Sequence, residues 1–406
     1  MVKDSARSWL VLLVVTFSMF LEVGTIKAFS VLLPDIEQQL DTHLWIVGSS
    51  IAIMTGFGYT FGLLTDSIIK LFSPRVCVMA SGLIATVGLI VCSFATNSFT
   101  LLFGLILSGF LLVQETVVQG IIPDYFERYY ETAVGIYSCG TALAILTFPL
   151  ATQLVLDVYG WKGTLLLISG IVLHSIPCGA LLKSEKSRAS DYEPILDHQS
   201  TSNDKGPQLS LVRHFFKTLG LHLLTSKDFV TRVFIPALVL GYTLTGWLIY
   251  MVSFVVSKNA SLKEATIVVT SGGFGMMTVR IGIFLLHKIM TYKQLVYLAS
   301  VTMTLSMILM TVFTGLIALN IISVIFGAAI GVLGTELFIS AKINSHESEH
   351  FLAIAWLNLA HGLASILSGF VTGIIFDMTG SFTLSFNILA GASLVTAISL
   401  GFGDIF

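Results

Sequence analysis

Twelve long hydrophobic segments, six on each side of a polar stretch from Leu182 to Asp228, constrain this chain more than any other feature. A bilayer core about 30 Å thick is crossed by a helix of about 20 apolar residues, and each segment is near that length. Hydrophobic residues make up 55% of the chain and charged residues 11%, whereas soluble domains average about 45–50% and 25%. The pattern therefore predicts an all-α membrane protein with two halves.

The helices divide the chain into an N-terminal six-helix bundle (1–182), a cytoplasmic linker (183–228) and a C-terminal six-helix bundle (229–406). In the linker, apolar and basic residues interleave between 209 and 219, which is typical of an amphipathic helix at the membrane interface; a plain tether is the simpler interpretation. The expected helices span residues 8–33, 43–66, 74–95, 99–122, 132–155, 161–182, 229–256, 264–287, 293–314, 316–340, 352–376 and 381–403.

The distribution of Lys and Arg predicts the orientation, because cytoplasmic loops collect basic residues. With the N-terminus in the cytoplasm, 16 of the 21 basic residues lie on the cytoplasmic side. Both termini are then cytoplasmic. The first hydrophobic segment is long enough to span, and no small-residue cleavage site stands out behind it, so it is expected to remain as a helix.

Ionisable side chains within the predicted helices are the candidate functional residues, since each costs several kcal/mol in lipid. In carriers with two six-helix halves, the first, second, fourth and fifth helices of each half line the central pathway. All but one of the ionisable residues fall on such helices, and the exception, His174, is interpreted as a hydrogen-bonded packing residue. The seven residues are Glu22, Lys27, Glu115, His174, Arg280, Glu336 and His361.

The two cations, Lys27 and Arg280, are the candidate substrate-binding residues. They lie in opposite halves of the chain, Lys27 in the outer part of the first helix and Arg280 in the inner part of the eighth. A guanidinium grips a carboxylate through two parallel hydrogen bonds, so the pair is suited to holding one anion alternately. The alternative is that Arg280 pairs with Glu115 or Glu336 and locks the halves together.

The remaining acids and His361 are candidates for coupling or gating. Glu22 precedes Lys27 by five residues and therefore points to a different face of the helix. Glu22 and Glu115 are candidate proton acceptors, whereas Glu336 is expected to reach water at the inner end of its helix. His361 titrates near neutral pH, although a histidine beside Asn358 is more often a hydrogen-bonding packing residue.

The loop after the second helix carries a first motif, which reads Gly-Leu-Leu-Thr-Asp from Gly62 to Asp66 and is followed by Lys70 and Arg75. It resembles the cytoplasmic signature of the major facilitator superfamily, in which a glycine lets helices approach and an aspartate caps a neighbouring helix. The resemblance implies the fold of that superfamily, and it makes Gly62 and Asp66 part of a conformational motif.

A second group of motifs resembles the monocarboxylate transporter family (solute carrier family 16). In that family a Tyr-Phe pair, basic residues and small residues precede and open the fifth helix, and a lysine in the first helix engages substrate, the position of Lys27 here. The resemblance makes Tyr125, Phe126 and Arg128 conformational residues. The matching segments are 125–128 (YFER), 133–135 (AVG), 138–140 (SCG), 160–163 (GWKG) and 178–181 (CGAL).

The chain also departs from that family in three places. The acidic-Gly-Gly-aromatic-Gly-aromatic opening is reduced to Asp4-Ser-Ala-Arg-Ser-Trp9, which keeps only its ends, and the basic pair is reduced to Arg128 followed by Tyr129. Proton-coupled members carry Asp four residues before the arginine of the eighth helix, where this chain has Met276. Proton coupling by that route is therefore not expected.

The sequence favours a secondary carrier of a small organic anion or zwitterionic metabolite, working by alternating access. The resemblance implies a substrate from a wide range: lactate, pyruvate, ketone bodies, aromatic amino acids, creatine-like zwitterions or carnitine-like compounds, with Met276 weakening the case for simple proton-coupled lactate transport. It also implies a plasma-membrane location and permits a single-span glycoprotein chaperone. A transport-deficient sensor or assembly partner is the alternative, because degeneration would leave the same eroded motifs. No metal cluster, nucleophile–base constellation or phosphate-binding loop emerges, so neither an enzyme, a cofactor nor a nucleic-acid partner is expected.

Overall fold

Each long apolar segment forms a helix, which satisfies backbone N–H and C=O groups within one segment, as a bilayer requires. The structure is a computed structural model that describes residues 4–65, 68–69, 72–182, 220–346 and 349–405. The elements before residue 183 are α1 (Ala6–Gln39), α2 (Leu44–Phe61), η1 (Gly62–Leu64), α4 (Pro74–Ser93), α5 (Ser98–Ser108), α6 (Phe110–Tyr125), α7 (Tyr130–Val172) and α8 (Ser175–Leu181). Those after residue 219 are η2 (Leu221–Thr225), α10 (Lys227–Phe229), η3 (Val230–Phe234), α11 (Ile235–Val256), α12 (Leu262–Ile289), α13 (Tyr292–Val312), α14 (Leu316–Ile343), α15 (His350–Thr379) and α16 (Thr383–Ile405).

Ten helical segments of the described chain are long and apolar enough to cross a membrane. The sequence predicts twelve such helices, and the difference has two sources. The segment Tyr130–Leu181 is counted once although it is 52 residues long, and the apolar part of α16, Thr383–Ser399, is counted as a shorter helix. Within the 52-residue segment, Gly160 has a non-helical backbone (φ 64°, ψ 176°). That glycine stands between the predicted helices 132–155 and 161–182.

The chain reverses direction at Gly160. Before the glycine, Gly140 packs against the α1 backbone at Thr16. Just after it, the Trp161 indole donates a 2.6 Å hydrogen bond to Gln39, at the far end of α1. Further on, Ser175 packs against Gly82 in the middle of α4, and Gly179 packs against Val78 and Met79 nearer its start. Two antiparallel arms therefore make up α7, as predicted.

The predicted boundaries agree with the structure to within a few residues, with one clear error. The first helix was expected to end at residue 33, before Pro34, but α1 continues to Gln39 with Pro34 inside it. A proline removes a single N–H donor, and here the helix tolerates that loss. The predicted amphipathic helix of the linker (209–219) and Asp66 lie outside the described residues.

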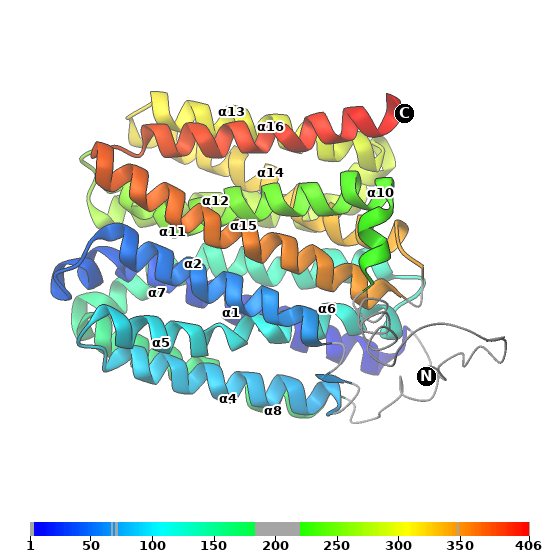
Figure 1. Cartoon of the computed structure of the whole chain (residues 1–406), viewed down its shortest axis with the longest axis horizontal. Helices are drawn as coiled ribbons and strands as arrows, with labels where there is room; N and C mark the ends of the chain where they lie inside the picture. The colour runs from blue at the N-terminus through cyan, green and yellow to red at the C-terminus, as the bar shows by residue number, and fades with distance from the viewer. Residues whose placement is uncertain (1–3, 66–67, 70–71, 183–219, 347–348, 406) are drawn as a thin grey trace, which may run out of the picture.

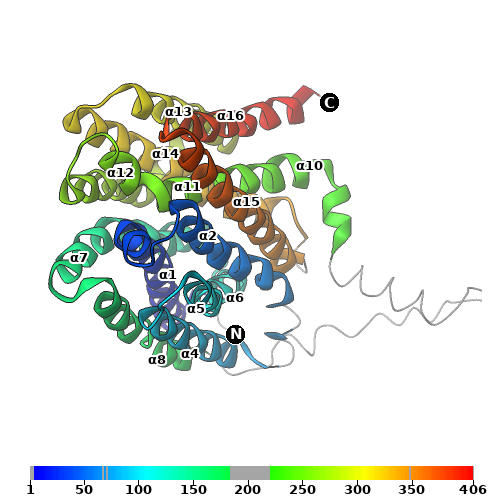
Figure 2. The same cartoon turned by 60° about the vertical axis from the view of Figure 1, so that its left-hand side comes forward.

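The helices form two groups, called here the N-terminal half (up to Leu182) and the C-terminal half (from Gly220). Figures 1 and 2 show the N-terminal half, in blue to teal, below the C-terminal half, in green to red. The halves meet where α2 packs along α15, α7 along α12 and α1 along α11. Both chain termini lie at the same end of the molecule (Figure 1).

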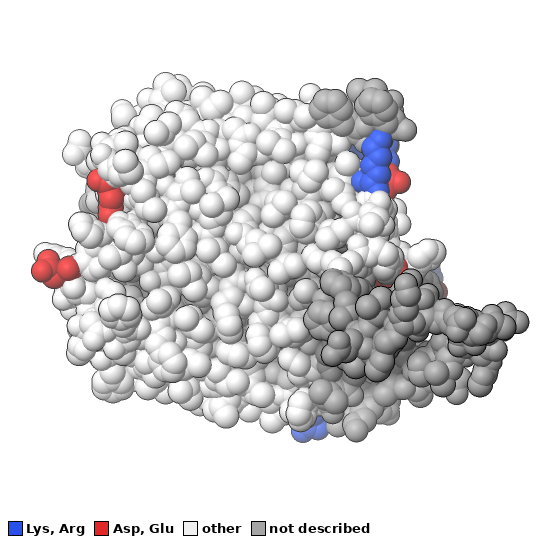
Figure 3. Space-filling model, viewed as in Figure 1, with Lys and Arg blue, Asp and Glu red and all other residues white. Residues whose placement is uncertain are grey.

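The lateral surface is apolar, as a protein surrounded by lipid requires. Large side chains in the middle of helices are exposed, such as Leu298 and Leu305 of α13 at 52% and 55%. On the face shown in Figure 3, charged side chains of the described residues lie at the two ends of the molecule and leave the middle uncharged. The chain is therefore a multi-pass integral membrane protein.

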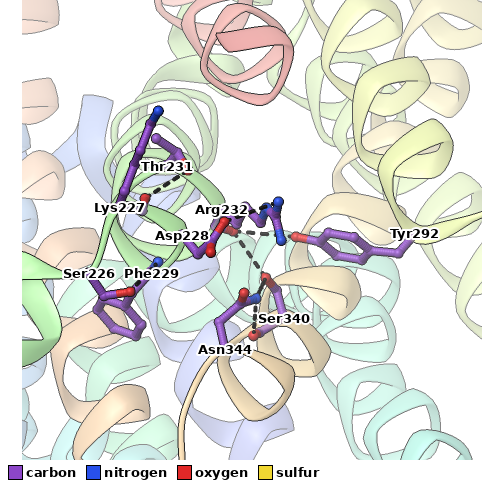
Figure 4. A network of polar contacts seen from close by, with 9 residues as sticks. All are labelled: Ser226, Lys227, Asp228, Phe229, Thr231, Arg232, Tyr292, Ser340 and Asn344. Carbon is purple, nitrogen blue, oxygen red and sulfur yellow. Dashed lines mark hydrogen bonds and ion pairs between the residues drawn. The ribbon is translucent and has the colours of Figure 1, made fainter. Parts of the chain in front are cut away.

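A short π-helical segment, η3, begins the seventh transmembrane helix (Figure 4). Its cause is Pro236, which has no N–H to donate to the carbonyl of Arg232 four residues earlier. Two side chains from other helices replace that donor: Tyr292 of α13 at 3.3 Å and Ser340 of α14 at 3.1 Å. The start of this helix is thereby fastened to α13 and α14.

Removing both replacement donors is expected to destabilise the protein more than removing either one. Ser340→Ala or Tyr292→Phe alone should lower the free energy of unfolding by about 0.5–1.5 kcal/mol, and the double variant by about 1–3 kcal/mol, because the Arg232 carbonyl then loses both side-chain donors. Thermal unfolding in detergent measures this. Ser300→Ala is the control, since that hydroxyl bonds only to Val296 of its own helix; equal effects of Ser340→Ala and Ser300→Ala would contradict the expectation.

Candidate functional site

A cavity of about 720 Å³, open space at its mouth included, lies between the two halves. Its walls come from α1, α2, α6 and α7 of the N-terminal half and from α11, α12, α14 and α15 of the C-terminal half. These are the eight helices that were expected to line a central pathway. The polar lining residues are Thr55, Tyr59, Glu115, Thr141, Thr245, Arg280, Asn358 and His361, and the others are apolar apart from Gly334.

Arg280 brings a positive charge into this cavity from α12. Its side chain is 6% exposed, and one terminal nitrogen donates a hydrogen bond to the backbone carbonyl of Ser138 on α7. Within the described residues, its Nε has no hydrogen-bond partner and no carboxylate lies within the 4.0 Å of an ion pair. Arg280 therefore makes no direct ion pair with Glu115 or Glu336 in this structure, although it interacts electrostatically with Glu115.

Glu336 is paired elsewhere, which corrects a second expectation. The residue was expected to reach water, but it is 0% exposed, and its Oε1 lies 2.9 Å from Nε2 of His287 on α12. Both side chains belong to the C-terminal half, one on α14 and the other on the last turn of α12. Glu336 is not among the residues that line the cavity.

Lys27 lies behind the cavity wall, toward the end of the molecule opposite the chain termini. Its side chain is fully buried, and its Nζ donates a 2.8 Å hydrogen bond to the backbone carbonyl of Leu248 and lies 4.3 Å from the ring centroid of Trp247. Ser30, one turn further along α1, donates to the carbonyl of Ile249 at 2.9 Å. These contacts join α1 to α11 and close that side of the cavity.

Glu22 and Glu115 meet at the N-terminal wall of the cavity. The phenol of Tyr59 donates a 2.9 Å hydrogen bond to Glu22 Oε1, and the amide of Gln119 donates to Glu115 Oε1. The antiparallel helices α1 and α6 pack together here: Gln119 Nε2 lies 3.9 Å from Met19 Sδ, and Glu22 and Glu115 lie side by side, each one turn from that contact. Glu22 therefore faces α2 and α6, whereas Lys27, 140° further around the same helix, faces α11.

The two histidines differ in their surroundings. His361 lies in the cavity wall on α15, and its ring meets that of Tyr59 edge to face, with 4.8 Å between centroids. Asn358, one turn earlier, donates to Thr116 at 3.0 Å. His174 is exposed between α7 and α8, with Nδ1 3.0 Å from the carbonyl of Gly170. It is hydrogen-bonded as predicted, but it is not a packing residue.

The end of the molecule that carries the chain termini is also closed by contacts between the halves. Tyr130 of α7 lies 3.3 Å from His350 of α15, measured between the phenol oxygen and Nε2. The ring of Tyr137 meets that of Phe338 at 6.1 Å between centroids. Polar and aromatic contacts thus join the halves on both sides of the cavity, which lies between two layers of inter-half packing.

The second motif contacts the remnant of the opening motif. The Asp4 backbone N–H donates to the Tyr125 carbonyl at 2.8 Å, and the Asp4 carboxylate accepts from the Arg128 N–H at 3.2 Å. Trp9 meets Phe126 edge to face at 5.2 Å between centroids. The two residues that this chain retains from the family opening, Asp4 and Trp9, thus both hold the 125–128 segment. In the first motif, a Cβ on Gly62 would lie 2.5 Å from Thr116, so α2 and α6 approach closely there.

Six polar residues of the site were not among the sequence candidates: Thr55, Tyr59, Gln119, Thr141, Thr245 and Asn358. Gln119 was detectable, because it follows Glu115 by four residues and so lies on the same helix face. Tyr59 and Thr245 carried no signal in a single sequence, since their roles depend on neighbours in other helices. None of the four cysteines, all of which are described, forms a disulfide. Within the described residues, no group of three or more His, Cys, Asp or Glu could hold a metal ion.

Comparison with known proteins agrees with this architecture. The chain is 26% identical over 408 residues to Monocarboxylate transporter 13 of Bos taurus, covering 97% of this chain and 88% of that protein. It is 25% identical over 368 residues to Monocarboxylate transporter 12 of Homo sapiens, covering 82% and 68%. These relatives confirm the resemblance drawn from the motifs. The model of the Major Facilitator Superfamily matches residues 12–341. With that match over most of its length, the chain belongs to the major facilitator superfamily.

Proposed function

We propose that this protein is a secondary carrier of a small organic anion, which binds in the central cavity at Arg280. The observation that carries the proposal is a buried guanidinium that lines an inter-half cavity and lacks a carboxylate partner among the described residues. A buried guanidinium nitrogen without an acceptor is costly, and the carboxylate of an anionic substrate would supply that acceptor. The halves would then rock about the site to expose it alternately on the two sides of the membrane.

The cavity lining supports a small, partly apolar anion. Leu240, Leu244 and Leu248 of α11 form an apolar wall, and Thr245 and Asn358 add neutral hydrogen-bonding groups near it. A monocarboxylate with a short apolar body fits this chemistry, and the names of the relatives point to the same class.

Several finer assignments complete the proposal. The end that carries the chain termini faces the cytoplasm, because most Lys and Arg residues belong to that side. The Gly62–Asp66 and Tyr125–Arg128 motifs control conformational change at that end, and Glu22, Glu115 and His361 serve coupling or gating. The carrier acts in the plasma membrane with a single-span glycoprotein chaperone; for both, the support is the family resemblance alone.

An uptake screen in expressing cells tests the function. Labelled lactate, pyruvate and acetoacetate are offered to cells that display the wild type, Arg280→Ala or the control Lys263→Ala, which alters an exposed cation outside the cavity. Saturable uptake of at least one anion should appear with the wild type and the control and be lost with Arg280→Ala. No saturable uptake, despite wild-type protein at the surface, would favour the sensor alternative.

Lys27 is proposed as a second contact, used when α1 and α11 separate and free its Nζ from Leu248. Lys27→Met is then expected to lower uptake about tenfold or more, through the loss of a charge-assisted hydrogen bond. Ser30→Ala is the matched control, because it removes the adjacent bond between the same helices without removing a charge. Similar losses in the two variants, measured as initial uptake rates, would show that Lys27 acts only as a closure contact.

A further inference from the structure

Two buried carboxyl groups meet on the N-terminal side of the cavity, one from α1 and one from α6. Glu22 is 1% exposed and Glu115 is 6% exposed. Each has one oxygen that accepts a hydrogen bond, from Tyr59 and Gln119 respectively. The other oxygen of each carboxyl group is buried and has no donor among the described residues. The pair thus has two acceptor oxygens to which no described side chain donates a hydrogen bond.

Carboxylates that lie side by side and away from water repel each other strongly, so such a pair holds a proton. A proton between the two groups gives the remaining oxygens a donor and removes one of the two charges. The proton belongs to the pair and not to either residue. In its resting form the pair therefore carries one proton and one negative charge.

The ionisable groups around the pair come from four elements. Tyr59 of α2 donates to Glu22, Tyr137 of α7 lies within electrostatic reach of Glu115, and His361 of α15 packs against the Tyr59 ring. Arg280 of α12 shares the cavity with Glu115 and interacts with it electrostatically, beyond ion-pair distance. The described cavity residues of α11 and α14 are not ionisable. Arg280 is thus the cation of the cavity lining, and the pair is its counter-charge.

This arrangement keeps the charge of the site constant during a transport cycle. In the empty cavity, the positive Arg280 faces a pair with one negative charge. When a monocarboxylate binds Arg280, it adds one negative charge, and a second proton on the pair cancels it. The sum is the same in both states, whatever the charge on Lys27, so neither form is penalised for crossing the apolar interior.

We infer that the Glu22–Glu115 pair is the proton-coupling site of this carrier, sharing one proton when the cavity is empty and taking up a second with each anion. The inference rests on the proposed function. The pair would take the role of the Asp that proton-coupled members of the family carry at the position of Met276. That residue is buried in α12 against Gly331 of α14 and does not line the cavity.

Transport by purified, full-length protein in liposomes tests the coupling. With an acid-outside gradient, the wild type should accumulate labelled lactate or pyruvate. Glu22→Gln and Glu115→Gln should each reduce this accumulation about tenfold or more, since one carboxyl of the pair is lost. Both should retain exchange of labelled for unlabelled anion at equal pH, which requires no net proton movement and shows that the variants fold and bind.

Glu336→Gln is the matched control, because it changes an equally buried glutamate that lies outside the cavity. It should retain both accumulation and exchange. The inference is overturned if gradient-driven accumulation survives in both Gln variants. It is also overturned if the wild type transports these anions without any response to the gradient.

A spectroscopic measurement separates this inference from the proposed function. Infrared spectra of the purified protein near neutral pH should contain the carbonyl band of a protonated carboxylic acid that shifts in deuterium oxide. The band should persist in Glu336→Gln and disappear in the Glu22→Gln/Glu115→Gln double variant. If neither anion is transported, the proposed function fails, but the band still shows whether the pair holds a proton. An identical band in the double variant refutes the shared proton.

Discussion

Replacement of Arg280 by Lys is expected to reduce uptake about 10- to 100-fold although it preserves the charge, because one hydrogen bond to a charged group contributes about 1.5–3 kcal/mol. The guanidinium bonds to the Ser138 carbonyl with one terminal nitrogen and leaves Nε unpartnered among the described residues. It is planar and presents several donors at fixed angles. An ammonium group is a point charge on a flexible stem, and it cannot hold the α7 backbone and grip a carboxylate in the same geometry.

Initial uptake rates, normalised to surface expression, measure this effect. Lys288→Arg is the control, since it makes the reverse exchange in the last turn of the same helix, away from the cavity. Its uptake should match that of the wild type. Full uptake by Arg280→Lys would show that charge alone suffices and would remove the bidentate contact from the proposed function.

The fold was predictable because lipid imposes simple rules on a sequence. A helix is the simplest way for a single segment to satisfy its backbone in a bilayer, so twelve apolar segments located the helices to within a few residues. The alternation of the chain across the membrane then determined which helices face each other. The cavity wall, to which eight helices contribute, follows from that order.

The pairing of the buried charges could not be predicted in the same way. Glu336 contacts His287, 49 residues earlier in the chain, and Lys27 donates to a backbone carbonyl of Leu248. The choice of partner depends on helix rotation, and hydropathy does not determine rotation. The interpretation of His174 as a packing residue failed for a related reason: it lies where α7 ends and α8 begins, and the apolar segment gave no sign of that break.

The opening motif shows how an eroded sequence can keep its structural role. Asp4 and Trp9 are the two retained positions, and the structure brings both to the segment before α7. In the family's opening motif, the positions between these two hold glycines and an aromatic residue. In this chain the same positions hold other residues, which lie at the start of α1. The contact to the segment before α7 therefore needs only Asp4 and Trp9, which the sequence alone did not reveal.

The largest effect on folding is expected from Gly327→Ala, where α14 crosses α12. A Cβ at residue 327 would lie 1.9 Å from the backbone carbonyl oxygen of Gly272. Small residues allow membrane helices to approach at backbone distance, and a backbone atom cannot rotate away as a side chain can. The helices must therefore separate, which should lower the free energy of unfolding by about 1–3 kcal/mol, the usual cost of overpacking.

Gly170→Ala is the same chemical change, but it is not expected to lower the free energy of unfolding. A Cβ at residue 170 has nothing within 4 Å, and alanine favours a helix over glycine by about 0.8–1.0 kcal/mol. Thermal unfolding in detergent should therefore place Gly170→Ala at or above the wild type and Gly327→Ala below it. Because Arg280 lies on α12 and Gly334 lies against its guanidinium from α14, separation of these helices should also lower anion uptake. Equal stability of the two variants would mean that the α12–α14 crossing is looser than the structure shows, and the position of Arg280 in the cavity would then lose its support.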